Sequence, residues 1–277
     1  MDLDFTLAGL GMLVIALLSA GLLVGFLSGL LGIGGGGIMV PVLYETFTAL
    51  GVDPDIRMHM AIGTSLAVIV PTSLRSFAAH RAKGAVDMDA LKRMAPWIVL
   101  GVVIGVLIAD QVSSDTLKWV WVVFGTVFAA KMAIGTGDWR LGTELPNPPK
   151  LEIASTLIGI ASVLLSIAGA AFTVTLLTLY NRPILKAVAT SSGFGPLIAI
   201  PGMIGLAWAG WGDPGLPPLS LGYISVVGAL IITSASLLTA PLGVRAAHGI
   251  PRRYLELAFA AFLAIVATRF LVSLILD

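Results

Sequence analysis

Long uncharged runs separated by short polar segments dominate the chain, a pattern typical of helices that cross a membrane. The first run, residues 5–44, carries no charged side chain. As one helix it would be about 60 Å long, roughly twice the ~30 Å thickness of bilayer hydrocarbon. The run must therefore break, and the glycine-rich segment 32–37 is the place because consecutive glycines are costly in a helix. The pattern predicts a full span over 8–31 and a short helix over 38–50.

The later membrane segments are delimited by charged residues, glycines and prolines. We predict them at 59–79, 94–111, 115–135, 152–167, 170–180, 184–210, 219–242 and 254–276. A polar stretch with three prolines, 136–150, divides them into two sets. The chain is therefore predicted to contain a first membrane repeat (1–135), a cytoplasmic linker (136–150) and a second membrane repeat (151–277).

The two sets resemble each other in order. Matches at an offset of 134 run from Gly25 and Gly159 through Ser28 and Ser162 to Leu43 and Leu177. Thr64-Ser65 matches Thr190-Ser191, and a last group at an offset of 138 runs from Gly105 and Gly243 to Lys131 and Arg269. Five elements that match in the same order indicate an internal duplication.

Basic residues indicate that the halves are inverted. The loop after the third element has five in the first half (Arg75, Arg81, Lys83, Lys92 and Arg93) and none in the second. The next loop reverses this, with Lys118 in the first half against Arg245, Arg252 and Arg253 in the second. The positive-inside rule then places corresponding loops on opposite sides and both termini outside. The predicted fold is an all-α polytopic membrane protein of two inverted repeats, each with about five segments and a broken or short helix, as in many secondary transporters.

Composition supports a membrane protein and narrows the chemistry. The chain is 57% hydrophobic and 11% charged, whereas a soluble domain has about 25% charged residues. There is no cysteine, and the three histidines are scattered, which argues against disulfides, metal sites and thiol chemistry. The acidic start, Met1 to Asp4, argues against a signal peptide. We expect no cofactor and no nucleic acid; the bilayer is an expected partner, and a homo-oligomer stays open.

Several motifs together resemble the TauE/SafE family, also called the sulfite exporter family. They are the run GLLGIGGGGIMVPVL (29–43), AIGTSL (61–66), Pro71-Thr72-Ser73 and HRAKGAVD (80–87). The resemblance covers nearly the whole chain and implies a cell-membrane transporter of small sulfur-containing or organic anions, such as sulfite or sulfonates. The second half departs from the pattern, since its small-residue stretch reads SIAGAA (166–171) and Thr175 replaces the proline.

The two breaks and the matched hydroxyls are the candidate substrate site. Glycines at the break would let backbone amides and the next helix N-terminus face an anion. The alternative is close helix packing, which the four-residue spacing of Gly21, Gly25 and Gly29 fits. The hydroxyls could bind anion oxygens or could donate to their own helix backbone. The predicted substrate-binding residues are Gly34, Gly35, Gly36, Gly37, Thr64, Ser65, Ala168, Gly169, Thr190, Ser191 and Ser192.

Two charged residues could serve gating or the anion path. Arg75 follows Pro71-Thr72-Ser73 and could line the path, or it could snorkel to the inner interface. Glu45 lies on the short helix and could carry a coupling proton, or it could lie near the outer surface. Whether the short helices cross fully or are re-entrant stays open.

The sequence thus predicts a non-enzymatic secondary transporter, of the exporter type, that works by alternating access around a midplane site. A small anion is the expected substrate, with a coupling proton as an option. An anion channel is the main alternative, because pores also use small residues and hydroxyls. An intramembrane serine protease using Ser192 would need a histidine at comparable depth, which the predicted helices do not offer.

Overall fold

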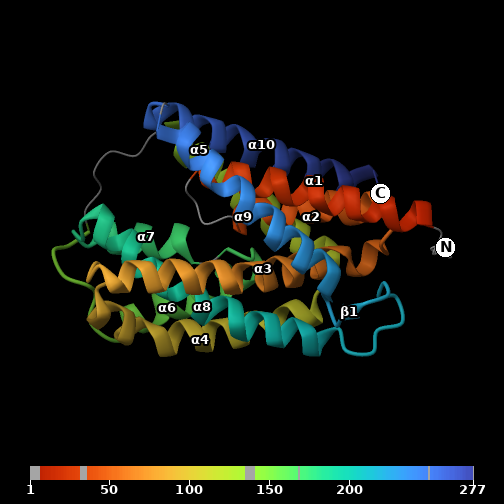
Figure 1. The fold of residues 1–277 in the computed structure, drawn as a ribbon. Coiled ribbons are helices and arrows are strands. Elements are labelled where there is room, and N and C mark those ends of the chain that lie inside the picture. Colours follow the sequence, from red (N-terminus) through yellow and green to blue (C-terminus); the bar gives the residue numbers. More distant parts are fainter. Residues whose placement is uncertain (1–6, 32–35, 135–140, 168, 249, 277) are drawn as a thin grey trace.

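The computed structural model describes residues 7–31, 36–134, 141–167, 169–248 and 250–276, and over these the chain is almost entirely helical (Figure 1). The elements are α1 (Leu7–Leu31), α2 (Gly36–Ala49), α3 (Pro54–Ala82), α4 (Met88–Gln111), α5 (Ser114–Ile134), α6 (Lys150–Leu164), α7 (Ala170–Leu179), α8 (Ile184–Ala209), β1 (Ser220–Leu221), β2 (Ile224–Ser225), α9 (Val226–His248) and α10 (Arg252–Leu276). Within the described residues, six helices (α3, α4, α5, α8, α9 and α10) are long and apolar enough to cross a membrane. The predicted all-α polytopic fold is confirmed.

Helix boundaries follow local signals. α2 and α7, which follow the two predicted breaks, have only 14 and 10 residues. α3 begins earlier than predicted because Asp53 caps it, its Oδ1 accepting a hydrogen bond from Asp55 N, and Pro54 suits the first turn.

Residues 219–225 were predicted to be helical, and this is wrong. Leu219 and Gly222 have φ values of 61° and 53°, which no α-helix contains, and the segment forms the antiparallel β1–β2 hairpin. Tyr223 N donates to Leu206 O, which holds the hairpin against the end of α8. α9 consequently begins at Val226, after the hairpin.

Small residues bring helices of the two halves into close contact. α1 packs on α9 through Gly21 and Gly25, where a Cβ at Gly21 would lie 2.7 Å from Ala235 Cβ. For these two glycines, close helix packing is therefore the role seen in the structure.

The α1–α9 contacts have counterparts between α6 and α4. The counterpart pairs are Gly25–Ser236 and Gly159–Ile98, Leu22–Thr239 and Thr156–Gly101, and Phe26–Gly243 and Ile160–Gly105. Each pair is related to its counterpart by the offsets of 134 and 138 that the sequence shows. These contacts favour the interpretation of the chain as two repeats. In each repeat the first helix packs on a helix of the other repeat, α1 on α9 and α6 on α4.

The helices form two layers in Figure 1. One layer contains α1, α5, α9 and α10, the other α3, α4, α6 and α8, and α2 packs on both α1 and α3. The start of α1 and the end of α10 lie at the same end of the bundle as the β hairpin, which we call the hairpin end. The opposite end, called the basic end, contains the α3–α4 loop (83–87) and the start of α8, which are joined by a hydrogen bond between Asp87 and Thr190.

Candidate functional site

The two broken helices meet inside the protein. α2 begins at Gly36, which is buried against the main chain of Ser166 and Ile167 between α6 and α7. A Cβ at Gly36 would collide with Ser166 O and lie 2.9 Å from Ile167 Cα. At Gly37 the nearest atom would be Phe259 Cζ at 3.7 Å, an ordinary contact. The close approach of the breaks therefore requires glycine at position 36 and leaves room for a methyl group at 37.

Local hydrogen bonds close the carboxyl end of α6. The bonds are Leu165 N to Ala161 O (3.1 Å), Ser166 N to Val163 O (3.1 Å) and Ile167 N to Ser162 O (2.9 Å). The chain then turns through Gly169, whose φ of 72° suits glycine, and α7 begins. The carbonyl groups of Ala161, Ser162 and Val163 are thus already used by the protein, which weakens this helix end as a cation site.

A helix amino terminus lies at the second break. The first N–H groups of a helix lack intrahelical partners, and each amino terminus carries the equivalent of about half a positive charge. The first described residues of α2, Gly36 and Gly37, are buried. α7 starts after Gly169, close to the segment that contacts Gly36. The amino terminus of α7 therefore brings partial positive charge to the segment that contacts Gly36.

Two buried hydroxyl groups next to the breaks lack partners. Ser65 and Ser162 are fully buried, and neither Oγ has a hydrogen-bond partner among the described residues. Ser162 Oγ lies 3.8 Å from the Cβ position of Gly169, hence beside the start of α7. Ser65 lies one turn beyond Ile62, whose carbonyl accepts a hydrogen bond of 3.3 Å from Ser166 Oγ. A buried unsatisfied hydroxyl costs about 1–3 kcal/mol, so these two groups call for a ligand or another explanation.

The matched threonines connect helix ends instead of meeting at the breaks. Thr64 Oγ1 accepts a hydrogen bond of 2.9 Å from Ser225 N, at the start of α9. Thr190 Oγ1 accepts one of 2.8 Å from Asp87 N, at the start of α4, and donates to Lys186 O. Ser225 follows Asp87 by the same offset of 138 found elsewhere, so the two bonds are counterparts at opposite ends of the bundle.

Other predicted hydroxyls bond to their own helix. Ser191 Oγ donates to Val188 O (2.8 Å) and Ser192 Oγ donates to Ala189 O (2.6 Å). Gly34, Gly35 and Ala168 lie outside the described residues. Ser162 was missed as a candidate, although its match with Ser28 was a usable signal.

Neither charged candidate lies beside the breaks in this structure. Glu45 Oε1 pairs with Arg269 Nε of α10 at 3.1 Å, and both side chains are about half exposed (45% and 47%). Arg75 is exposed on α3, between two exposed neighbours. Their roles in gating or in an anion path stay predictions.

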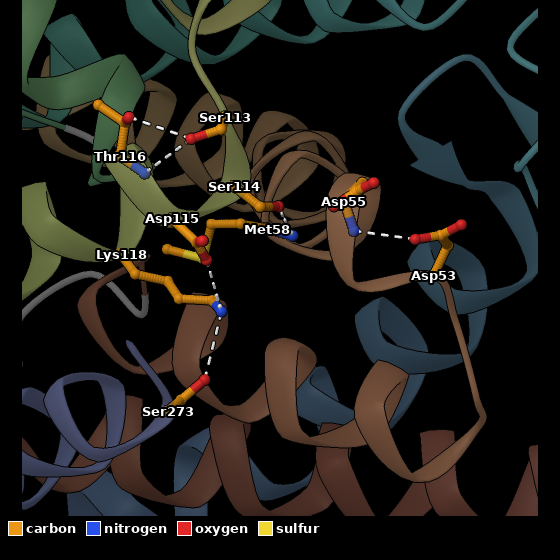
Figure 2. Close-up of polar contacts among 9 residues, drawn as sticks. All are labelled: Asp53, Asp55, Met58, Ser113, Ser114, Asp115, Thr116, Lys118 and Ser273. Carbon is orange, nitrogen blue, oxygen red and sulfur yellow. Dashed lines mark hydrogen bonds and ion pairs between the residues drawn. The ribbon is translucent and has the colours of Figure 1, made fainter. Parts of the chain in front are cut away.

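A buried lysine at the hairpin end was not anticipated. Lys118 lies in the first turn of α5 with a side chain only 4% exposed. Its Nζ donates to Asp115 Oδ1 (3.0 Å) and to Ser273 Oγ of α10 (3.2 Å), as Figure 2 shows, and it lies over the Tyr44 ring of α2. Nearby, Met58 N donates to Ser114 Oγ. This cluster joins α5, α10, α2 and α3.

At the basic end, Asp87 lies between the start of α4 and the start of α8. Its Oδ2 lies 3.6 Å from both Arg182 Nε and Lys186 Nζ, and its Oδ1 accepts a hydrogen bond from Ala90 N. Burial alone would raise the pKa of the Asp87 carboxyl, but the Ala90 hydrogen bond and the two cations outweigh it and lower the pKa. Asp87 is therefore an ionised link between the start of α4 and the start of α8.

In the part of the chain that the structure describes, six helices are able to span a bilayer and the start of the short helix α2 packs on the segment before the short helix α7, an arrangement typical of multi-pass membrane transporters. The chain belongs to the TauE/SafE sulfite exporter family, whose model matches residues 17–270. The resemblance drawn from the sequence motifs is confirmed.

Two relatives agree with this assignment. The chain is 35% identical over 254 residues to a probable membrane transporter protein of Haemophilus influenzae, covering 92% of this chain and 96% of the relative. It is 26% identical over 257 residues to a probable membrane transporter protein of Methanocaldococcus jannaschii, covering 90% and 92%. No solved structure matches the chain. Neither relative's name states a substrate.

Proposed function

We propose that this protein is a secondary transporter, of the exporter type, that moves small sulfur-containing or organic anions such as sulfite or sulfonates across the cell membrane. The observation that carries the proposal is the contact of Gly36 with Ser166 and Ile167. It joins the break of the first half to the break of the second at a buried position. Discontinuous helices that meet in this way form the substrate sites of many secondary transporters.

Three features of the meeting point favour an anion over a cation. The amino terminus of α7 brings partial positive charge, as does the helix start that the sequence predicts after the glycine run. Ser65 and Ser162 offer hydroxyl donors that the protein itself leaves unused. Three carbonyl groups at the end of α6, those of Ala161, Ser162 and Val163, accept hydrogen bonds within the turn and are not free for a cation.

The proposed site therefore contains Gly36, Gly37, Ser65, Ser162 and Gly169. Gly34, Gly35 and Ala168 stay in it on the sequence alone. The hydroxyl groups of Thr64, Thr190, Ser191 and Ser192 already have partners and are left out.

Alternating access is the proposed mechanism, with two inverted halves moving against each other around this site and with both termini outside. The counterpart contacts of α1–α9 and α4–α6 support the halves as equivalent units. The reversal of basic loops between the halves supports the inversion. A site between two such units can open to either side while its own residues move little.

Flux into proteoliposomes tests the proposal. Purified protein is reconstituted and offered a panel of sulfite, alkyl sulfonates and small carboxylates. We expect a saturable flux of at least one of these anions that depends on a counter-ion gradient. An ohmic current without saturation would instead indicate a channel, and the absence of any anion flux from correctly inserted protein would refute the proposal.

A further inference from the structure

We infer that Arg182 and Lys186, at the basic end, form an entry site for the substrate anion, and that the carboxylate of Asp87 occupies this site until the anion displaces it. The inference rests on the proposed function and adds to it a second binding site, separate from the meeting point of the breaks. It follows from a comparison of two equivalent contacts at opposite ends of the bundle.

The start of α4 and the start of α9 are attached to the other half of the chain in the same way. Asp87 N donates to Thr190 Oγ1 (2.8 Å), and Asp87 Oδ1 accepts a hydrogen bond from the N–H group three residues later in α4 (3.1 Å). Ser225 N donates to Thr64 Oγ1 (2.9 Å), and Ser225 Oγ accepts a hydrogen bond from the N–H group three residues later in α9 (3.1 Å). A neutral hydroxyl group therefore makes the same attachment at the hairpin end that a carboxylate makes at the basic end.

The basic end adds charges to this attachment that its counterpart lacks. Asp87 Oδ2 lies 3.6 Å from both Arg182 Nε and Lys186 Nζ. The residues at the matching positions of the hairpin end, 126 residues earlier as for the two threonines, are Ile56 and Met60, which are apolar and buried. Because the attachment forms there without any cation, holding the start of α4 does not explain why the basic end has two.

Asp87 leaves the hydrogen-bonding capacity of the two cations unused. A charge-assisted hydrogen bond from nitrogen to a carboxylate is about 2.7–2.9 Å long, so contacts of 3.6 Å are ion pairs without a hydrogen bond. Arg182 Nε is buried and has no hydrogen-bond partner among the described residues. One carboxylate also balances only one of the two positive charges. An oxyanion with several oxygens can accept hydrogen bonds from both side chains and supplies what this pair lacks.

The pair is accessible from the water and lies on the side from which an exporter takes its substrate. The side chains of Arg182 and Lys186 are 35% and 48% exposed, whereas that of Asp87 is 11% exposed. α7 connects the pair with the second break, because its ten residues, about 15 Å of helix, run from Gly169 to the segment that contains Arg182. In the proposed topology the basic end faces the cytoplasm. An anion that binds the two cations also releases Asp87 from the start of α8, which loosens one contact between the halves where the anion enters.

Uptake of sulfite into right-side-out and inverted membrane vesicles tests the inference, because each end of the bundle faces the added anion in one preparation. Asp87→Asn removes the competing charge and keeps the cap of α4, since asparagine caps helices as well as aspartate does. We expect this variant to have a lower apparent KM than the wild type when sulfite is added at the basic end. Arg182→Gln and Lys186→Gln should each raise that KM roughly tenfold, the usual effect of a lost hydrogen bond to a charged ligand. The KM at the hairpin end should stay at the wild-type value in all three variants.

The opposite signs of these effects distinguish an entry site from a structural ion pair. If the two cations only held Asp87 in place, all three variants would shift the KM in the same direction, and the inference would be wrong. An unchanged KM in both cation variants would also overturn it, as expected for side chains that bind only lipid phosphates.

A matched control separates the pair from the general charge of this end. Lys92→Gln removes an exposed cation of α4 and should leave the KM unchanged. A rise equal to that of Lys186→Gln would assign the effect to surface charge and contradict the entry site. In each of these cases the wild type still transports sulfite, so the proposed function survives. No uptake of sulfite or of any other anion of the panel by the wild type would refute the proposed function and this inference together.

Discussion

Gly36 and Gly37 are adjacent glycines with different surroundings. The first touches the main chain of Ser166 and Ile167, whereas the second has only ordinary side-chain contacts. The sequence predicted both as site residues because a glycine run interrupts a long apolar segment. It could not separate them, since the difference arises from a segment 130 residues away.

Alanine substitutions should separate the two glycines. Gly36→Ala forces the breaks apart and should destabilise the protein by about 1–3 kcal/mol, the usual cost of overpacking. Gly37→Ala is the matched control and should melt close to the wild type. The measurement is the Tm of the purified protein in detergent, and equal Tm values for the two variants would contradict the described contact between the breaks.

The serine residues show the same limit of sequence reasoning. In an apolar helix, a serine that donates to its own backbone looks like one that does not. Ser191 and Ser192 were predicted as ligands but donate to carbonyls of α8, and Ser162 was missed although its hydroxyl is unpaired. Whether a serine hydroxyl faces the breaks depends on where α3 and α7 lie relative to it. The spacing of residues along the chain does not give that position.

Individual elements were predicted well where apolar length and breakers set them. The predicted spans 8–31 and 38–50 correspond to α1 and α2, which end and begin around the glycine-rich segment. The β hairpin was missed because the apolar pattern continues through it. Its two-residue turn lies at Gly222-Tyr223, where Gly222 has a φ of 53°, and Leu219, just before β1, adopts a φ of 61° that leucine does not favour. α9 is correspondingly shorter at its start than the apolar pattern suggested.

Two counterpart hydrogen bonds connect elements across the repeats, and valine substitutions test them. Thr190→Val and Thr64→Val remove the acceptors of Asp87 N and Ser225 N while keeping the side-chain shape. Each should cost about 1–3 kcal/mol because a backbone N–H loses its partner. Thr72→Val is the control, since the Thr72 hydroxyl donates to its own helix. The measurement is the Tm of the three variants. A decrease in Tm for Thr72→Val equal to that of the other two would show that the hydrogen bonds to Asp87 N and Ser225 N do not stabilise the protein more than a bond within one helix.

The Asp87 link between α4 and α8 should be pH-dependent. Because folding lowers the pKa of Asp87, its contribution to stability is present above the unfolded pKa and is lost as the pH falls through the folded value. Asp87→Asn should therefore lower the Tm at neutral pH, and the difference from wild type should shrink on acidification. Asp89→Asn, two residues further on and exposed, removes the same charge as a control. A Tm difference for Asp87→Asn that is independent of pH would argue against the ionised link.

At the scale of the whole molecule, the sequence predicted the order of the elements and the equivalence of the halves. The counterpart contacts of α1–α9 and α4–α6 were not predictable, because repeats alone do not say which helix of one half packs on which helix of the other. The structure shows the same packing twice, once between α1 and α9 and once between α6 and α4. Small residues permit the close approach of the helices in both places.

The proposed topology predicts opposite labelling of two corresponding loops. Lys83 and Trp211 are exposed and follow the third helix of each half. In this cysteine-free chain, Lys83→Cys should react with an impermeant maleimide only from the cytoplasmic side and Trp211→Cys only from outside. Labelling of both positions from one side would contradict the inverted arrangement.

The central claim, that an anion binds where the two breaks meet, is tested most directly by the substrate dependence of flux in two serine variants. Ser162→Ala removes an unpaired hydroxyl beside Gly169, and Ser155→Ala removes an unpaired hydroxyl two turns earlier on the same helix. A hydrogen bond to a charged ligand contributes about 1.5–3 kcal/mol, which corresponds to a rise in apparent KM of roughly 10- to 100-fold. We predict this rise for Ser162→Ala with the Ser155→Ala variant unchanged. Equal KM values for Ser162→Ala and the wild type would contradict the account.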